Sequence, residues 1–464
     1  MVDFHQSISL SRSKMKKLKN ISIFGTSSDA GKSTLTFVIA KILQDLGYNV
    51  APFKAQNVSN NAVACQDGSE IAVAQYFQAE VLGLEPIYQM NPILLKSGQK
   101  NSASLIVNGR AVASKDVREY YRDLDGLKPA VKTSFEYMDK HYDCVVAEGA
   151  GSPVELNLMD KDLSNIYIAT EFDTKIILVA DIEKGGVFAS IWGVYNLLPK
   201  QLRENVLGVI VNKFRGDMSL FDKGIEIIEQ EFKIPVLGVL PYIPFNLGFE
   251  DSQSLMNYQQ KSRSDAKRVA VIAYPTMSNY NDFEPLIADE NIALEFVQHN
   301  VSLEGFDEVI LAGSKLVMRD LAWLKETGLF EQLKKRTKPI LGICGGYEMM
   351  FQIIYDPYAI ESEEPTRVEG LGFIDDEILF QQEKIVKRGI YTVFGEEVEG
   401  FEIHHGTSHK YSLSYEQGNI RGTFVHGLFN DKAFEAYKRE RIDSFVKEMR
   451  ERLDVAKILD IISL

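Results

Sequence analysis

A short glycine-rich segment, Gly25–Ser33 (Gly-Thr-Ser-Ser-Asp-Ala-Gly-Lys-Ser), constrains the fold of this chain more than any other feature. The apolar residues Ile21–Phe24 precede it, and apolar residues repeat at the spacing of one helix face over 35–46. A loop between a strand and a helix directs backbone N–H groups and a helix N-terminus at phosphate oxygens. In such a loop Lys32 can reach the outer phosphates, and the Ser33 hydroxyl can ligate Mg²⁺. The segment predicts a site for ATP or a similar nucleotide, although its two glycines lie one residue further apart than in the usual motif.

Strand-like and helix-like segments alternate over most of the chain. Strands are predicted at 49–53, 142–147, 175–180, 206–211 and 236–240, helices near 70–82, 186–198 and 220–232, and a second series of strands from 268–273 onward. Apolar strands separated by helices are typical of a mostly parallel sheet covered on both faces. Because 464 residues exceed one ordinary core, we expect two α/β domains. The predicted parts are an N-terminal extension (1–20), a nucleotide-binding domain (21–250), a polar linker (251–267), a second domain (268–450) and a C-terminal helical tail (451–464).

Charge and composition exclude several classes of protein. A net charge of −14 argues against nucleic acid as a partner, because such binding rests on Lys and Arg that neutralise phosphates. No stretch approaches the roughly 20 apolar residues that a membrane span needs. The first residues are basic but lack the apolar core of a signal peptide, and Met15 is an alternative start. The 3 cysteines are too widely spaced for a disulfide framework or a zinc site, so we expect a cytoplasmic protein.

A second chemical signature, Gly-Ile-Cys-Gly-Gly, lies where an apolar strand over 339–343 runs into a predicted helix. Its small residues permit the sharp turn of a nucleophile elbow, which presents Cys344 at a helix N-terminus, where a thiolate is favoured. The N–H of Gly345, with a second donor from the loop at Gly313, could bind an oxyanion. A thiol nucleophile also needs a base, and His426, at the end of a short apolar strand, is the candidate.

Each of these residues also has a simpler interpretation. Taken alone, Cys344 could be a buried core thiol, and His426 a hydrogen-bonded polar residue. The glycine-flanked junction of strand and helix favours the catalytic pair. The residues His404, His405 and His409 suggest a metal site, but their spacing fits neither one helix face nor one strand face. We predict instead that they form a loop near the active site.

Together these features resemble the cobyric acid synthase family of cobalamin biosynthesis. The resemblance rests on the two signatures and on further stretches at 51–57, 90–96, 148–157, 180–190, 211–217, 238–242 and 401–404. It implies an α/β fold of two domains, a P-loop ATPase of the dethiobiotin-synthetase type with a parallel sheet and a flavodoxin-like class I glutamine amidotransferase. It also implies amidation of the b, d, e and g carboxylates of adenosylcobyrinic acid a,c-diamide, driven by ATP and Mg²⁺ with L-glutamine as nitrogen donor. A homo-oligomer is compatible with it.

The resemblance extends to individual residues of the synthetase half. The implied ATP contacts are Gly25, Thr26, Asp29, Gly31, Lys32, Ser33, Thr34 and Asn212. The implied Mg²⁺ ligands are Ser33, Glu148 at the end of an apolar strand, and Asp67, which could equally be a plain turn residue. Candidate contacts to the corrinoid or to phosphate are Lys54, Asn57, Asn91, Lys96 and Asp181, of which the two lysines could also be merely solvated.

The chain departs from the family's motifs at two places, and two other functions remain as alternatives to the one that the resemblance implies. Related triad amidotransferases read His-Pro-Glu, whereas this chain has Gly and Leu after His426, which leaves a dyad or an acid from elsewhere. After Gly313 the family tends to have Ser-Lys-Asn-Thr, but here Leu316 and Val317 replace the last two. An a,c-diamide synthase acting on cobyrinic acid or another tetrapyrrole is one rival. A partition-type ATPase switch with a non-catalytic second domain is the other.

Overall fold

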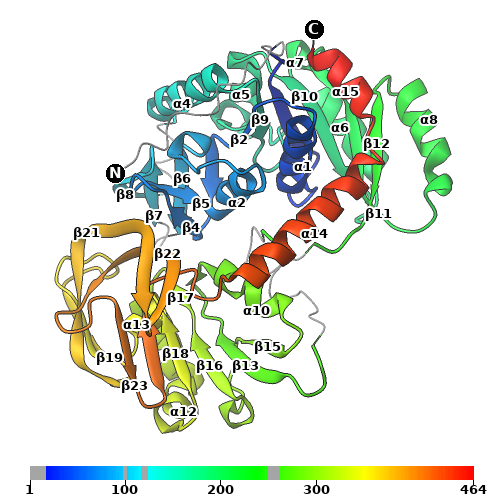
Figure 1. The fold of residues 1–464 in the computed structure, drawn as a ribbon. Coiled ribbons are helices and arrows are strands. Elements are labelled where there is room, and N and C mark those ends of the chain that lie inside the picture. Colours follow the sequence, from blue (N-terminus) through cyan, green and yellow to red (C-terminus); the bar gives the residue numbers. More distant parts are fainter. Residues whose placement is uncertain (1–16, 98–101, 117–123, 246, 249–261, 464) are drawn as a thin grey trace, which may run out of the picture.

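The computed structural model of the chain describes residues 17–97, 102–116, 124–245, 247–248 and 262–463. Its first half is built on a six-stranded sheet with the strand order β12-β11-β10-β1-β9-β2, in which every neighbouring pair is parallel (Figure 1). The strands are β1 (Ile21–Gly25), β2 (Val50–Phe53), β9 (Cys144–Glu148), β10 (Lys175–Asp181), β11 (Val206–Phe214) and β12 (Val236–Pro241). The alternation of strands and helices predicted from the sequence is confirmed here.

Both faces of this sheet are covered, because its strands carry apolar residues that point to both sides. Strands β1 and β9 are buried along their whole length. One face packs against α1, and the other face packs against α4 and α6. The helices of this half are α1 (Lys32–Asp45), α2 (Val73–Val81), α4 (Lys128–His141), α5 (Ile166–Glu171), α6 (Val187–Leu197), α7 (Lys200–Arg203) and α8 (Asp222–Gln230). The arrangement brings the carboxyl ends of the parallel strands to one edge, where such sheets bind ligands.

Two small sheets extend this half toward the second domain. The first has the order β3-β6-β7-β8, and the second is the β4-β5 hairpin. Their bounds are β3 (Gln56–Val58), β4 (Ala62–Ala64), β5 (Glu70–Ala72), β6 (Ile93–Ser97), β7 (Ser102–Val107) and β8 (Arg110–Asp116). The helix predicted over 70–82 therefore starts later, since its first residues form β5.

The second half is built on a six-stranded sheet with the order β15-β13-β16-β18-β24-β23, parallel except for its last pair. Its strands are β13 (Lys267–Ile272), β15 (Ile292–Val297), β16 (Glu308–Leu311), β18 (Ile340–Ile343), β23 (Ser414–Gln417) and β24 (Ile420–Thr423). Its helices are α10 (Glu284–Ala288), α11 (Val317–Thr327), α12 (Leu329–Lys335) and α13 (Gly345–Glu348). One contiguous apolar core spans this half.

A second, mostly antiparallel sheet flanks the core of the second half and reaches the first half. It has the order β20-β19-β21-β22, with β19 (Phe351–Asp356), β20 (Thr366–Glu369), β21 (Ile374–Val393) and β22 (Glu396–Thr407). The long β21–β22 hairpin contacts β4 of the first half. A short β14 (Met277–Ser278) pairs with β17 (Gly313–Ser314), and the 3₁₀ turn η5 (Tyr280–Phe283) follows β14.

The C-terminal helices return to the first half. Helix α14 (Lys432–Arg450) lies along α1, where Phe445 packs 6.1 Å from Phe37 between ring centroids (Figure 1). The N–H of Asp454 then donates to the Leu237 carbonyl of β12, before α15 (Val455–Ile462). The predicted second domain, 268–450, is therefore wrong at its C-terminal end, since the apolar face of α14 is buried in the core of the first half.

Two other predicted parts fall mostly outside the described residues. The N-terminal extension is described from residue 17 onward, so Met15 lies outside, and the linker is described only from 262. No helix in the described part of the chain combines the length and apolarity that crossing a membrane requires.

Candidate active sites

The glycine-rich loop lies between β1 and α1, as predicted, and two of its residues have left-handed backbone. The φ angle is 101° at Gly31 and 57° at Asp29. A Cβ on Gly25 would lie 2.7 Å from the Ser27 carbonyl oxygen, so only glycine fits where the loop folds back. The Lys32 ammonium donates to that same carbonyl at 3.1 Å. Lys32 is thus held over the loop, where an outer phosphate of a bound nucleotide would lie.

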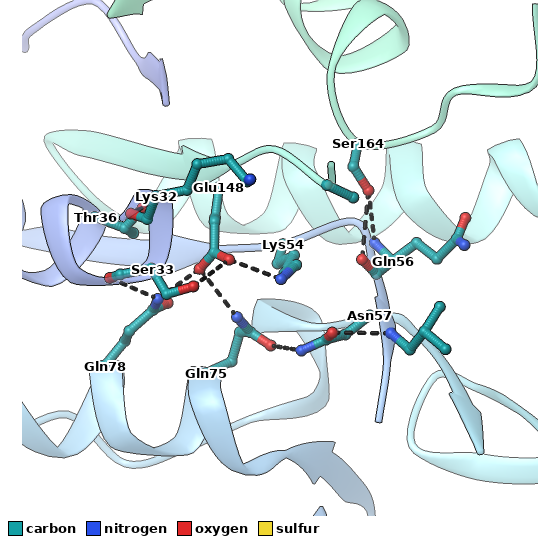
Figure 2. Close-up of polar contacts among 12 residues, drawn as sticks. Lys32, Ser33, Thr36, Lys54, Gln56, Asn57, Gln75, Gln78, Glu148 and Ser164 are labelled. Carbon is teal, nitrogen blue, oxygen red and sulfur yellow. Dashed lines mark hydrogen bonds and ion pairs between the residues drawn. The ribbon is translucent and has the colours of Figure 1, made fainter. Parts of the chain in front are cut away.

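Glu148, at the carboxyl end of β9, is the hub of this centre (Figure 2). Its buried carboxylate accepts from the Ser33 hydroxyl at 2.8 Å, from the Lys54 ammonium at 2.7 Å and from the Gln78 amide at 2.7 Å. A second amide, that of Gln75, donates to the Glu148 carboxylate at 3.4 Å, and the side-chain oxygen of Gln75 accepts from the Asn57 amide at 2.9 Å. The structure brings together the predicted residues Ser33, Glu148, Lys54 and Asn57 from segments far apart in the sequence.

The donor set fits a magnesium ion. Ser33 and Glu148 supply a hydroxyl and a carboxylate oxygen side by side at the start of α1, and Mg²⁺ prefers oxygen ligands. The Oε1 atom of Gln78 is buried and, among the described residues, has no hydrogen-bond partner. Asp67 does not join this group: its carboxylate accepts from the N–H and hydroxyl of Ser69 within the β4–β5 turn, which is the turn role left open above.

The remaining predicted nucleotide contacts lie around the loop, as does Asp181, which was predicted to contact the corrinoid or phosphate. The Asn212 amide donates to the Ala30 carbonyl at 2.9 Å and packs against Gly31, where a Cβ would clash with it. Asp181 pairs with Lys213 at 3.1 Å, and Lys213 in turn donates to the Asp29 carbonyl at 2.6 Å. These side chains therefore support the loop from the ends of β10 and β11. The N–H of Thr26 donates to β10, and Thr34 is half-buried in the first turn of α1.

Two predicted substrate contacts have structural roles instead. The Asn91 amide donates to the carbonyls of Lys54 and Ile93, and its oxygen accepts from the Ala72 N–H at 3.2 Å, so every polar position serves the backbone. Lys96 is buried and pairs with Glu70 at 2.6 Å. Neither side chain is available as a free contact for the corrinoid.

Glu70 also binds Lys384 of the second half, at 2.7 Å. Burial raises the pKa of Glu70, but the ammonium groups of Lys384 and Lys96 outweigh it and bring that pKa to about 2. Burial lowers the pKa of Lys96 to about 7 despite its carboxylate partner. The two halves are thus joined by a buried cluster of ions.

The thiol of Cys344 lies at a strained turn between β18 and α13. Its backbone has φ 49° and ψ −110°, a conformation that L-residues rarely adopt. A Cβ on Gly345 would lie 2.7 Å from the Ser314 nitrogen, and one on Gly346 would clash with the Leu311 carbonyl. Glycines at both positions let β17 approach the turn closely. This is the geometry of a nucleophile elbow.

His426, fully buried after β24, faces the thiol and a carboxylate that the sequence analysis missed. Its Nδ1 atom lies 2.7 Å from Asp282, whose other oxygen accepts from the Gly427 N–H at 2.9 Å. Burial lowers the pKa of His426, but the charges and hydrogen bonds of Asp282 and Cys344 raise it to about 10. The three residues form a Cys–His–Asp triad, whose acid comes from η5 instead of the position two residues after the histidine.

The surroundings of the thiol contain a close-packed glycine and a buried acid. A Cβ on Gly313 would lie 3.2 Å from the His426 ring, so the β17 backbone, the predicted second oxyanion donor, runs directly beside the triad. Burial raises the pKa of Glu348 well above its ordinary value, and the charge of Cys344 adds to this. Glu348 is therefore a buried carboxyl close to Cys344 whose charged form is disfavoured.

The predicted histidine loop is correct for His409, which lies beyond the end of β22, and wrong for the other two histidines. The segment does lie near the thiol, since Cys344 donates to the Ile403 carbonyl at 3.6 Å. His404 and His405 belong to strand β22, where His404 stacks on Phe424 with ring centroids 3.9 Å apart. Its Nε2 atom lies 3.2 Å from Glu402. Within the described residues, no group of three or more His, Cys, Asp or Glu side chains could hold a metal ion.

Comparison with known proteins assigns both halves of the chain to known domain families. Residues 21–247 match the CobQ/CobB/MinD/ParA nucleotide binding domain, and residues 268–434 match the CobB/CobQ-like glutamine amidotransferase domain. The cobyric acid synthase of Acinetobacter baylyi is 63% identical over 96% of this chain and 99% of that protein. The chain belongs to the cobyric acid synthase family. It is therefore an amide ligase with a nucleotide-binding domain and an amidotransferase domain.

More distant relatives also align with nearly the full length of this chain. A probable cobyric acid synthase of Methanothermobacter thermautotrophicus is 38% identical over 94% of this chain and 91% of that protein. A cobyric acid synthase of Clostridium botulinum is 35% identical over 96% of this chain and 100% of that protein. The amidotransferase match ends near the start of α14, which agrees with the packing of that helix on the first half.

Proposed function

We propose that this protein uses ATP and glutamine to amidate the b, d, e and g carboxylates of adenosylcobyrinic acid a,c-diamide. The observation that carries the proposal is the presence, in one chain, of a phosphate-binding loop with its Glu148 hub and a Cys–His–Asp triad. A ligase that makes amides from glutamine needs both chemistries. The resemblance to cobyric acid synthases supplies the corrinoid as acceptor.

The synthetase centre activates the acceptor. A carboxylate is a poor acyl donor to ammonia, because it lacks a good leaving group. The chain therefore binds ATP where Lys32 can contact its outer phosphates, so that a carboxylate can be phosphorylated and phosphate can leave when ammonia attacks. Ser33 and Glu148 would hold Mg²⁺, which neutralises phosphate charge when bound. Lys54, which pairs with Glu148 at 2.7 Å, is the second cation that we assign to the phosphates of bound ATP.

The triad supplies ammonia. His426, oriented by Asp282 through Nδ1, takes the proton of Cys344 at Nε2, and the thiolate attacks the side-chain carboxamide of glutamine. The N–H of Gly345 and the β17 backbone are the donors we assign to the oxyanion. Histidine returns the proton to the leaving nitrogen, ammonia departs, and water hydrolyses the thioester to glutamate.

Mass spectrometry of the corrinoid product tests this function. The enzyme is incubated with ATP, Mg²⁺, glutamine and the a,c-diamide, and glutamate release is followed in parallel. Four exchanges of hydroxyl for amino per corrinoid are expected, with glutamate formed in step. Amidation of cobyrinic acid to the a,c-diamide alone would instead identify the diamide synthase. ATP hydrolysis without glutamate release would identify the ATPase switch.

A further inference from the structure

Asn279 links the catalytic histidine to the other half of the molecule. Its Nδ2 atom lies 3.1 Å from Nε2 of His426. Its backbone N–H donates to the Asn61 side-chain oxygen at 2.7 Å, and its Oδ1 accepts from the Ala62 N–H at 3.2 Å. Asn279 belongs to the amidotransferase half, whereas Asn61 and Ala62 belong to the synthetase half. One buried residue therefore contacts both the catalytic histidine and the synthetase half.

The direction of the Asn279 amide is fixed by its partners. A backbone N–H can only donate, so Oδ1 must face Ala62, and the NH₂ group must face His426. Asp282 already accepts from Nδ1–H of the histidine, so in the neutral imidazole the lone pair lies at Nε2. An amide donor at Nε2 favours this neutral form against the imidazolium that Asp282 and Cys344 favour. Asn279 therefore donates to the lone pair that has to accept the thiol proton. In this arrangement it competes for the base with Cys344, which also hydrogen-bonds His426.

A continuous set of contacts runs from this amide to the nucleotide centre. Ala62 stands opposite Ala72 in the β4–β5 hairpin, and their N–H groups point outward, one to each side. The Ala72 N–H donates to Asn91, whose amide donates to the Lys54 carbonyl at 3.0 Å. Lys54 pairs with Glu148 at the carboxyl end of β9, which accepts from Ser33 at the end of the phosphate loop. A shift of Lys54 on nucleotide binding would reach Asn279 through one hairpin.

A cavity lies beside Asn279. This cavity of about 100 Å³ lies at the seam and is lined by residues of both halves, including Asn279 and Asp282 from one side and Tyr76 and Phe77 from the other. Asn279 itself has φ 53°, which asparagine tolerates better than most residues. The side chain is thus buried but not enclosed by close packing on every side.

We propose that Asn279 is a positioning residue that restrains glutamine hydrolysis until the synthetase half is loaded. Docked on Asn61 and Ala62, it occupies Nε2 of His426 and slows proton transfer from Cys344. Movement of the β4–β5 hairpin withdraws the amide and frees the base. Ammonia is then released only when an activated carboxylate is ready to receive it. The proposal rests on the proposed function and adds a route of regulation to it.

The test compares glutamate release with and without ATP, Mg²⁺ and the corrinoid a,c-diamide. Asn279→Gly is the variant of choice, because glycine accepts the left-handed backbone while both side-chain contacts are lost. Its unstimulated glutamate release is expected to rise by about tenfold, the effect of losing one hydrogen bond, and the stimulated-to-unstimulated ratio to fall toward one. Asn61→Ala should lower that ratio, and Asn61→Asp, which keeps the oxygen acceptor, should restore it.

Asn430→Ala is the matched control, since Asn430 lines the same cavity on the same seam. Its ratio should equal that of the wild type. A wild-type ratio in Asn279→Gly, whatever its absolute rate, would overturn the proposal, as would an equal loss of ratio in Asn430→Ala. Absence of glutamate release from the wild-type enzyme under every condition would instead overturn the proposed function itself.

Discussion

The two centres of this molecule draw their residues from the chain in different ways. At the phosphate centre, the loop and its first helix residues come from one segment, and the hub Glu148 comes from a neighbouring strand of the same sheet. At the thiol centre, Asp282, Cys344 and His426 come from three separate segments, and the acid lies 144 residues from its histidine. A local motif specifies the loop of the first centre, although Glu148 and Lys54 come from distant segments, whereas the second centre has no local motif that contains all three of its residues.

The carboxylates of the two centres differ accordingly. Glu148 accepts from a hydroxyl, an ammonium and an amide, all on side chains that a bound metal or phosphate could displace. Asp282 accepts from an imidazole and a backbone N–H, and both contacts hold one catalytic side chain in place. The first carboxylate is arranged to exchange partners, and the second to keep them.

The largest effect is expected at the phosphate centre. Lys32→Ala should abolish amidation with glutamine and with ammonia alike, because both require the activated carboxylate. Product amides measured with each nitrogen source check this. Lys184→Ala is the control. That lysine also lies near the loop, but its side chain is 63% exposed, and its ion pair with Asp29 is long, at 3.9 Å. Ammonia-driven amidation at the wild-type rate in Lys32→Ala would refute the assignment.

Next in size is the loss of the orienting acid. Asp282→Asn should lower glutamine hydrolysis by about 10³-fold, because the histidine loses its tautomer and orientation. Asp282 helps to raise the pKa of His426 to about 10, so the variant's pKa should fall and the alkaline limb of glutamate release should move to lower pH. Ammonia-dependent amidation is the internal control and should persist. An unshifted alkaline limb would show that Asp282 does not act through His426.

The two centres also differ in how many of their residues could be predicted from the sequence. The strand, loop and helix around Lys32 were predictable because their spacing is local, and Cys344 and His426 were predictable as a pair from the glycine-flanked elbow. Asp282 was not, since nothing around η5 distinguishes a triad acid from any buried polar residue. Its position becomes evident only when β14 and β17 pair and bring η5 beside His426.

Tertiary contacts likewise overrode several other predictions. A lysine after an apolar stretch suggested that Lys96 binds an anion of the substrate, but Glu70 satisfies it. Asn91 resembled a polar site residue, yet it ties three backbone groups together. The charged pattern of α14 gave no indication of which half it would cover. Burial partners of this kind depend on the whole fold and not on local spacing.

The buried ions at the seam offer a test of intermediate size. Glu70→Gln should lower the free energy of unfolding by about 3–5 kcal/mol, because Lys96 and Lys384 lose their shared counter-charge. Chemical denaturation measures this. The matched control is Glu80→Gln, which breaks a more exposed seam pair with Lys438 and should cost about 1 kcal/mol or less. Equal effects of the two variants would show that the buried cluster has no special role.

The pH dependence of the stability that this cluster contributes follows from the lowered pKa of Glu70. The pKa of Glu70 falls from 4.5 to about 2 on folding, so its stabilising contribution is complete above pH 4.5 and is lost as the pH falls through about 2. The wild type should therefore lose stability over this acid range more steeply than Glu70→Gln. Parallel acid profiles for the two proteins would contradict the assignment.

The smallest effect is expected for Asn91. Asn91→Ala should lower the free energy of unfolding by about 1–3 kcal/mol, since it leaves buried backbone groups unpaired. It should leave the KM for the corrinoid near that of the wild type, because the side chain serves the backbone and not the substrate. Steady-state kinetics and denaturation are measured on the same preparation. A large rise in KM without loss of stability would restore Asn91 as a substrate contact.

The central claim is that one chain holds two separate chemistries, and Cys344→Ser tests it most directly. Amide formation is measured in that variant with glutamine and, separately, with a high concentration of ammonium salt at raised pH. We predict that the glutamine-dependent rate falls by about 10⁴-fold or more, while the ammonia-dependent rate stays near that of the wild type. A parallel fall of both rates in a destabilised protein would contradict the account, because it would make Cys344 a core thiol and not the nucleophile.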